Sequence, residues 1–569
     1  MASHDSAVGL REKPGFFEAF TPKLITVWRE GYTLANLRAD ALAGLAVAIV
    51  ALPLSMAIAI ACGARPETGL YTSIIGGFVL SAFGGSRYQI GGPAGAFIVV
   101  VSMALQHFGA NGFLVAVMFA GVLLMIAGFL KLGTYVRYVP HPVIVGFTAA
   151  IAIVIFSSQI KYLFGLSVPH EPAAIAPKIM ALAQAYGTFS LATTLVSLAC
   201  IGIIVGLRAW RPHFPGFLAA VAFGAIANLA FKLKLATLGT AFGHMPRSLP
   251  LPHLPHVDFS LLAAVAPTAL TFAMLGSIES LLSAVVADGM TGRKHRSNGE
   301  LVAQGLANLA SAAFGGLAVT GVVARTAANI RAHAHGPLAG MFHAAFILIF
   351  LMFAAPATEQ IPLCALAAVL AVVCWNMADR ANFFAILKHD RGEALLLMVT
   401  FLLTLFTDLT IGITAGVTLG ALMFMHRMAE MTKVSVDPRG EDEDSVADAE
   451  DNNDDILVTR IAGPFFFGAA NSIGSVLERL GDRPKAFIVD LASVPMADVT
   501  GARTLQDFVT RVRKRGASVY LINTQPKVEQ ILQNCGLAMP FVTYARNEAE
   551  ARKMARAAFD APAPMAGIA

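Results

Sequence analysis

The chain has 569 residues, of which 56% are hydrophobic and only 14% are charged, and its formal net charge is +5. A soluble protein of this size carries roughly 25% charged residues, so the composition predicts a polytopic membrane protein instead. The charged side chains collect at the N-terminus, in short loops and after about residue 426. This distribution predicts a soluble C-terminal part. It does not indicate a basic patch that could bind a nucleic acid.

Residues 1–38 form the first predicted part of the chain, a cytoplasmic N-terminal segment. They contain no early apolar run and no small-residue cleavage site, so they are not a signal peptide. The five cysteines of the whole chain are scattered and include no C-x-x-C pair. This pattern indicates neither a disulfide framework nor a metal site.

Residues 39–428 form a predicted transmembrane domain, because apolar runs recur throughout them. We count about fourteen runs, some of them too short to cross a hydrocarbon core of ~30 Å alone. The ten-residue alternation of a membrane β-barrel is missing, so these runs are helices. They begin near Ala41, Gly69, Pro93, Gly112, Pro142, Leu191, Pro215, Leu261, Leu301, Val322, Pro337, Pro362, Ala394 and Ile411.

Loop charges predict the orientation of these helices. Alternate loops are basic, as at Arg208 and Arg211 or at 293–296, whereas loops such as 106–112 and 354–362 contain no lysine or arginine. By the positive-inside rule, the basic loops lie in the cytoplasm. An even number of helices then places both chain ends in the cytoplasm.

Two of the apolar runs are unusually short. One covers residues 91–108 and the other 320–336, and each follows a glycine-rich stretch and is the third run of a set of seven. Short, glycine-interrupted segments at corresponding positions of two halves are typical of an inverted-repeat transporter. The alternative is that the glycines and prolines merely kink ordinary helices.

The starts of these two short helices form the predicted anion site. A half-helix that begins at mid-membrane presents unpaired N–H groups and the positive end of its dipole, and two that face each other can bind an anion. Small side chains let the anion approach the backbone, and Arg325, about one turn into the second helix, adds a fixed charge. The predicted anion-binding residues are Ala94, Gly95 and Ala96 on the first helix and Gly321, Val322, Val323 and Arg325 on the second.

Glu279 is a lone carboxylate within the apolar run 267–287. A carboxylate in hydrocarbon costs ~3 kcal/mol or more, so such residues usually handle ions or protons. Ser283 at i+4 shares its helix face, and the two are the predicted cation-coupling site, with either a proton or a sodium ion bound. A structural alternative pairs Glu279 with Arg325 or with backbone N–H groups. Asp288, beside the basic loop that follows, is predicted to form an interfacial ion pair.

The C-terminal part begins with a strongly acidic linker at 436–455, which has too few apolar residues for a core. Residues 456–560 follow with the pattern of one small α/β domain. Strands are predicted at 456–461, 486–492 and 518–523, and helices at 470–480, 499–516, 526–536 and near 547–559. The chain carries no P-loop, nucleophile elbow or zinc-protease motif, so neither an enzymatic activity nor a cofactor is predicted.

Several stretches resemble the SulP family of anion transporters. They are Asp40-ALAGLAVAIVALPLSM, Gly84-GSRYQIGGPAGAF, Ala273-MLGSIESLLSAVVADGMTG and Gly321-VVARTAANIRA, and residues 456–560 resemble the STAS domain of the same family. The resemblance implies an all-α membrane domain of fourteen segments in a seven-plus-seven inverted repeat, followed by a cytoplasmic α/β STAS domain. Segments 1–4 and 8–11 would form a core and segments 5–7 and 12–14 a gate. The resemblance further implies an elevator-like cycle in a homodimer of the bacterial inner membrane.

The resemblance also implies a substrate and a coupling ion. The sequence is most similar to proton-linked members, which implies symport of a C4-dicarboxylate. The alternatives are transport of sulfate or bicarbonate, coupled to protons or sodium, and a passive channel or exchanger. Sodium-coupled members carry Asp at the position of Glu279 and Thr near Val323, so the residues here favour a proton. The family proline of the anion site is Pro93, although Ala94 replaces the hydroxyl residue that follows it in many members. In the STAS part, Val499 follows Asp498 where related soluble proteins carry a phosphorylatable Ser, which favours a structural or partner-binding domain.

Overall fold

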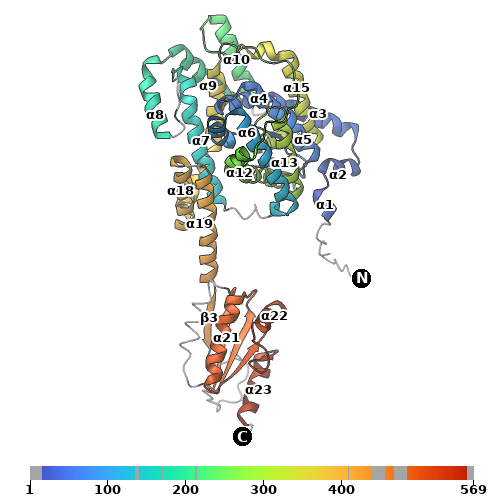
Figure 1. The fold of residues 1–569 in the computed structure, drawn as a ribbon, viewed down its shortest axis with the longest axis vertical. Helices are drawn as coiled ribbons and strands as arrows, with labels where there is room; N and C mark the ends of the chain where they lie inside the picture. The colour runs from blue at the N-terminus through green and yellow to red at the C-terminus, as the bar shows by residue number, and fades with distance from the viewer. Residues whose placement is uncertain are drawn as a thin grey trace. The chain divides into compact units, whose positions relative to one another are not determined.

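The computed structural model divides the chain into two compact units, Met1–Val417 and Thr418–Ala569. The first is built of helices and the second around a sheet (Figure 1). The structure describes residues 16–134, 140–168, 172, 175–211, 215–407, 409–437, 455–466 and 484–560.

The first half of the membrane domain contains seven membrane segments. Gly109, with φ at 67°, breaks α6 and so separates the third segment from the fourth. The second segment is continuous through a short π-helical turn, η1. The elements are α3 (Leu34–Ala61), α4 (Pro66–Tyr71) with η1 (Thr72–Gly76) and α5 (Gly77–Phe83), η2 (Gly95–Phe97) with α6 (Ile98–Phe129), α7 (His141–Phe164), α9 (Leu191–Trp210) and α10 (Gly216–Phe231).

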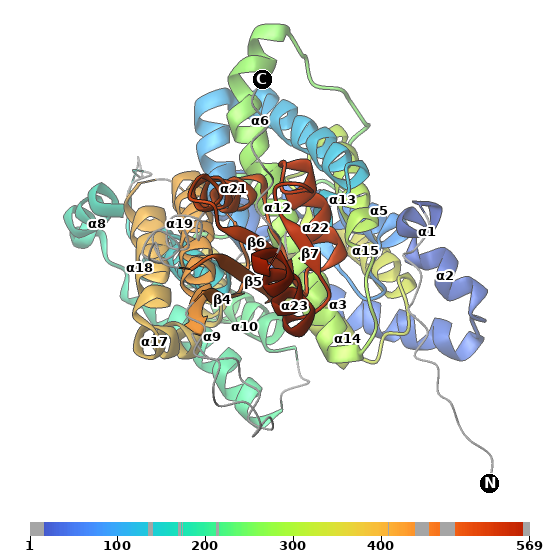
Figure 2. The ribbon, with the colours of Figure 1, turned by 90° about the horizontal axis from the view of Figure 1, so that it is seen from below.

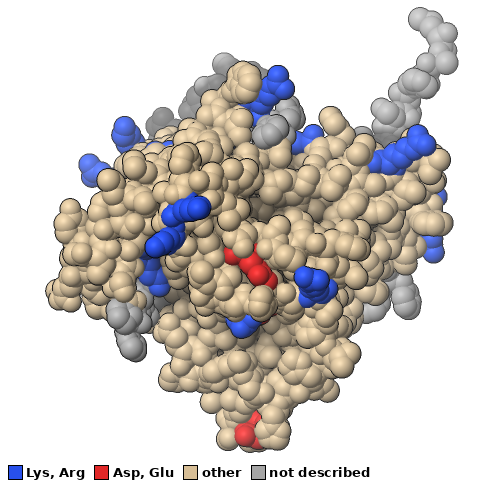
Figure 3. Space-filling view, turned by 90° about the horizontal axis from the view of Figure 1, so that it is seen from above, with Lys and Arg blue, Asp and Glu red and all other residues tan. Residues whose placement is uncertain are grey.

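The second half repeats this order. Its elements are α12 (Phe259–Thr291), α13 (Ser297–Ala313), α14 (Val323–Arg331), α15 (Leu338–Thr358), α16 (Leu363–Met377), α18 (Arg391–Phe406) and α19 (Leu409–Glu430). Each predicted apolar run lies on one of the helices of the two halves, and the 14-span inverted repeat is confirmed. Within the described residues, 8 helices are long and apolar enough to cross a membrane by themselves. Most of a face seen from above carries no charged side chain (Figure 3).

The largest contacts among the described membrane helices form two sets, which we call core and gate after the division that the resemblance implies. In the core, α6 packs on α12 and α13, and α3 packs on α15. In the gate, α7 packs on α16 and α18, and α9 packs on α10. Close approach within the core depends on small residues: a Cβ on Gly121 of α6 would lie 2.7 Å from the carbonyl oxygen of Gly305 on α13.

Several helices outside the apolar runs were not predicted, because their short or charged sequences give no membrane signal. Two of them, α1 and α2, fasten the N-terminal segment to the core: the Lys23 N–H donates to Gly84 O at 2.9 Å, and Arg296 Nη1 donates to Thr21 O at 2.9 Å. A hydrogen bond from Arg87 holds the pKa of the Glu30 carboxyl below its ordinary value. These helices are α1 (Phe16–Phe20), α2 (Lys23–Arg29), α8 (Ile175–Gln184), α11 (Leu238–Phe242) and α17 (Arg380–His389).

The second unit is an α/β domain with a sheet in the order β3-β4-β5-β6-β7. Only the β3–β4 pair is antiparallel. Alternate residues of β5 face opposite sides: Val489 packs with α21 and α22, whereas Ile488 packs with α23, which covers the other face (Figure 2). The elements are β3 (Lys433–Asp437), β4 (Ile456–Ala462), β5 (Ala486–Ser493), β6 (Ser518–Ile522), β7 (Thr543–Ala545), α21 (Val499–Lys514), α22 (Pro526–Asn534) and α23 (Glu548–Asp560).

The predicted α/β domain is confirmed, with two differences at its edges. Strands β3 and β7 were not predicted, and β3 occupies residues 436 and 437, where the acidic linker was expected to begin. A five-residue edge strand next to an acidic run gives too weak a period-two pattern to be recognised. The rest of the linker to residue 454 and the predicted helix at 470–480 lie outside the described residues.

Candidate functional site

The two half-helices begin side by side at a short antiparallel strand pair. Strand β1 (Gly91–Gly92) pairs with β2 (Thr320–Gly321), with Gly91 opposite Gly321. Helix η2 follows β1 and α14 follows β2, and neither is capped by a side chain at its N-terminus. The first N–H groups of both helices are therefore left for another acceptor.

The start of the first half-helix lies where the core meets the gate. Gly95 is half-buried. A Cβ added to it would lie 3.7 Å from Met377 Sδ on α16 and 3.9 Å from Ile155 Cδ1 on α7. On the second half-helix, Val322 and Val323 are half-buried. The other predicted residues, Pro93, Ala94, Ala96 and Gly321, are buried and shape the strand pair and the helix starts.

Arg325 is fully buried, with 1% of its surface exposed. Its Nη2 donates to Ser55 Oγ at 2.9 Å and its Nη1 to Ser73 Oγ at 3.2 Å. The guanidinium packs behind the strand pair, because a Cβ on Gly92 would lie 2.4 Å from Nη1. Among the described residues it forms no ion pair, so two neutral hydroxyls hold a permanent charge just behind the helix starts.

Glu279 does not pair with Arg325, so the structural alternative that joins them is wrong. Its Oε2 is buried and has no hydrogen-bond partner in the described protein, although the side chain as a whole is half-buried. On either side of this carboxylate, helix α12 is bonded to the segments that lead into the two half-helices. Gln89 Nε2 donates to Ser280 Oγ at 2.6 Å, and Thr320 Oγ1 donates to Gly276 O at 3.2 Å.

Ser283, the other predicted coupling residue, is bonded elsewhere. Its Oγ donates to Thr326 Oγ1 at 3.1 Å, and the same Thr326 oxygen accepts the N–H of Ile90 at 3.2 Å. Ser283 therefore links α12 to the second half-helix and to the residue before β1.

Sequence reasoning missed the polar partners of the site, which are Ser55, Ser73, Gln89, Thr320 and Thr326. Their signal is that each is a polar residue next to or within an apolar run.

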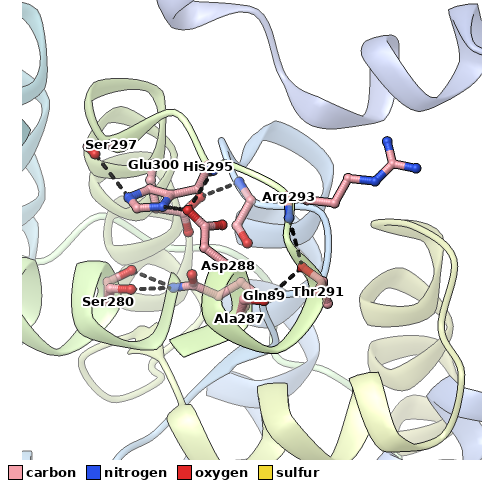
Figure 4. A network of polar contacts seen from close by, with 10 residues as sticks. Gln89, Ser280, Ala287, Asp288, Thr291, Arg293, His295, Ser297 and Glu300 are labelled. Carbon is pink, nitrogen blue, oxygen red and sulfur yellow. Dashed lines mark hydrogen bonds and ion pairs between the residues drawn. The ribbon is translucent and has the colours of Figure 1, made fainter. Parts of the chain in front are cut away.

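A second polar cluster lies at the C-terminal end of α12, where Asp288 contacts His295 (Figure 4). Asp288 Oδ2 lies 2.7 Å from His295 Nδ1, and His295 Nε2 lies 2.9 Å from Ser297 Oγ. Beside them, Glu300 is fully buried on the first turn of α13 and its Oε2 accepts the N–H of Ser86 at 2.9 Å. Asp288, predicted to form an ion pair, thus contacts a histidine, and the contact is ionic only when the imidazole is protonated.

The strand pair leaves no room for a side chain at Gly321, so Gly321→Ala is expected to lower the rate of anion uptake at least tenfold. A Cβ there would lie 1.5 Å from Gln89 Nε2, which must then leave Ser280 and disturb both helix starts. Uptake of labelled anion into proteoliposomes measures the effect. Gly202→Ala on α9, where a Cβ meets nothing within 4 Å, is the matched control and keeps normal uptake. Normal uptake by Gly321→Ala would contradict this geometry.

Two family matches and three similar proteins place the chain among known sequences and folds. The sulfate permease family matches residues 37–400, and the STAS domain matches residues 449–551. The putative sulfate transporter YvdB of Bacillus subtilis is 38% identical, over 89% of this chain and 95% of its own. The bicarbonate transporter BicA of Picosynechococcus is 29% identical, over 88% of this chain and 91% of its own. The structure of the murine anion transporter Slc26a9 in its inward-facing state matches with a TM-score of 0.84 at 18% identity, over 97% of both chains.

Proposed function

The chain belongs to the sulfate permease family of anion transporters, and we propose that it binds a small inorganic oxyanion between the starts of η2 and α14. The observation that carries this proposal is the buried charge of Arg325, which two hydroxyls hold and which has no carboxylate partner in the part of the chain that the structure describes. A buried cation without a counter-charge is costly, and a bound anion would supply that counter-charge.

Two further features favour an anion at this place. Each helix start carries roughly half a positive charge, and its N–H groups are free of side-chain caps. Across the interface, Ile155 and Met377 present apolar surface, which would exclude water and strengthen the attraction. Because only the core carries the charge and the helix starts, a bound anion would travel with the core if it moves against the gate. This elevator-like movement is part of the proposal.

The relatives favour sulfate or bicarbonate over the C4-dicarboxylate expected first from the sequence. YvdB is named for sulfate and BicA for bicarbonate. Backbone N–H groups around the small residues Ala94 and Gly95 would suit a compact oxyanion, whose oxygens can each accept a hydrogen bond. We therefore propose a compact inorganic oxyanion as the substrate, and a dicarboxylate becomes an outcome of the test.

The transporter is proposed to be proton-coupled through Glu279. An ionised carboxylate with a buried, unpartnered Oε2 would be strongly disfavoured, and a bound proton removes that cost. A sodium ion would need further oxygen ligands, and Val323, near which sodium-coupled members carry Thr, has no side-chain oxygen. Protonation would also remove the repulsion between Glu279 and an incoming anion.

Proteoliposomes test this proposal with three labelled anions, sulfate, bicarbonate and succinate, under imposed proton or sodium gradients. The expected result is concentrative uptake of sulfate or bicarbonate that an inward proton gradient drives and a sodium gradient does not. Protein-free liposomes are the control. Uptake of succinate alone would overturn the substrate proposal, and sodium-driven, pH-independent uptake would overturn the proton. Homodimer formation, a partner for the STAS domain and cytoplasmic chain ends stay predictions.

A further inference from the structure

We call four buried oxygen atoms on or against α12 and α13, one of them from Glu279, the column. Besides Glu279 Oε2, the Oε1 atoms of Gln89, Gln304 and Glu300 are buried and have no hydrogen-bond partner in the described protein. Gln304 and Glu300 are fully buried, and Gln89 is 4% exposed. Buried polar atoms without a protein partner usually bind ordered water, since leaving them unpaired costs about 1–3 kcal/mol each.

The orientations of both amides are fixed by their neighbours. Gln89 Nε2 donates to the carbonyl oxygen of Ser280 at 3.2 Å, and Gln304 Nε2 donates to that of Val319 at 3.3 Å. A carbonyl oxygen can only accept a hydrogen bond, so a nitrogen must face it in both cases. The two Oε1 atoms are therefore true acceptors that still need a donor.

The residues that carry these atoms are connected by contacts with α12 and by spacing along α13. Gln89 is bonded to Ser280, the residue next to Glu279. Gln304 packs against Gly276, where a Cβ would lie 2.7 Å from Gln304 Nε2, and Gly276 is one turn before Glu279 on α12. Glu300 is one turn before Gln304 on the same face of α13, which is a rise of about 6 Å.

The column ends at the cluster of Asp288 and His295, which reaches solvent. His295 interacts electrostatically with Glu300, and the side chain of Asp288 is 25% exposed. Figure 4 shows Glu300, His295 and Asp288 together above Gln89 and Ser280. Other charged groups at this end are Lys23 of α2, which interacts with Asp288, and Arg87, Arg296 and Glu30, which interact with Lys23.

We infer that these residues hold a chain of buried waters that carries the coupling proton between Glu279 and the Asp288–His295 pair. In each step a water or carboxyl group takes a proton from one neighbour and releases another to the next, so one proton enters, one leaves and every group returns to its starting state. For uptake, the proton leaves Glu279, passes Gln304 and Glu300 and reaches solvent at Asp288, on the side predicted to be cytoplasmic. The inference rests on the proposed proton coupling.

Two variants test the column and leave every predicted anion-binding residue unchanged. Gln304→Leu replaces an amide by an apolar side chain of similar size, and Glu300→Gln keeps an acceptor for the Ser86 N–H but cannot pass on a proton. Both are expected to lower proton-driven uptake, and the proton flux measured with an internal pH dye, at least tenfold. Exchange of labelled for unlabelled anion requires no net proton release, so its rate and its KM stay at the wild-type values. Thr271→Val, an apolar substitution on α12 two turns before Glu279, is the control and changes neither.

The outcomes separate this inference from the function on which it rests. If Glu279→Gln abolishes proton-driven uptake while Gln304→Leu and Glu300→Gln keep wild-type proton flux, the column is wrong and the proposed coupling stands. If both variants lose anion exchange as well, their role is structural and the column is also wrong. If wild-type uptake does not respond to a proton gradient, the proposed coupling itself fails. A selective loss of proton flux, with exchange intact, is the result that supports the column.

Discussion

Glu279→Gln is expected to abolish accumulation driven by a proton gradient and to leave anion exchange in place. Glutamine has the size of a protonated glutamic acid and is neutral, so the anion site can still fill. Glutamine cannot release a proton. Once the anion has left, the transporter therefore cannot return without its anion in the deprotonated state that net proton-driven uptake requires. We expect proton-driven accumulation to fall at least ~100-fold, about 2.7 kcal/mol in rate terms, and uptake to lose its dependence on pH.

Proteoliposome uptake across a range of external pH measures this effect, with counterflow exchange as the parallel assay. Glu279→Asp is the matched variant, since it keeps a titratable carboxyl group one methylene shorter, and it should retain part of the pH dependence. Wild-type accumulation by Glu279→Gln would contradict the assignment of Glu279 as the coupling group. Loss of both accumulation and exchange in Glu279→Gln would instead make Glu279 part of the anion site or of the fold.

Arg325→Leu is expected to raise the KM for the anion about 100-fold. At an effective dielectric constant of about 20, a unit charge about 6 Å from an anion contributes about 3 kcal/mol, which corresponds to this change in affinity. Leucine fills much of the buried space but leaves Ser55 and Ser73 without their charged partner. Initial uptake rates over a range of anion concentrations give the KM.

Arg325→Lys is the control that separates the effect of the positive charge from the effect of the shape of the guanidinium. A lysine keeps the positive charge but lacks the planar fork that reaches both hydroxyls, so the KM should rise by less than in Arg325→Leu. Purified protein that elutes as a single species and retains its thermal stability separates lost binding from lost folding. An unchanged KM in folded Arg325→Leu would show that the buried charge does not act on the substrate.

The helices and the general place of the site could be predicted because their signals are local. Apolar length marks each membrane segment, and glycines interrupt the two short segments at matched positions. Gly95 and Val323 were predicted as site residues in this way, since a helix that begins inside the membrane must leave N–H groups exposed. The two faces of β5 follow from simple alternation, as Ile488 and Val489 show.

The contacts of the site could not be predicted because they join residues far apart in the chain. Gln89 and Ser280 are separated by 191 positions, and Arg325 and Ser55 by 270. From the sequence alone, the obvious partner of a membrane arginine is the lone membrane carboxylate, Glu279. In the structure the strand pair and Gly92 position Arg325 against α3 and η1, so hydroxyls bind it. The buried Oε2 of Glu279 has no hydrogen-bond partner among the residues that the structure describes.

A structure of the full chain with bound selenate, a heavier analogue of sulfate, tests the central claim most directly. The account predicts an anomalous peak between Gly95 and Val323, within hydrogen-bond distance of N–H groups from both half-helices, and predicts that Arg325→Leu removes it at the same selenate concentration. A selenate peak that lies only elsewhere in the molecule, or one that persists unchanged in Arg325→Leu, would contradict it.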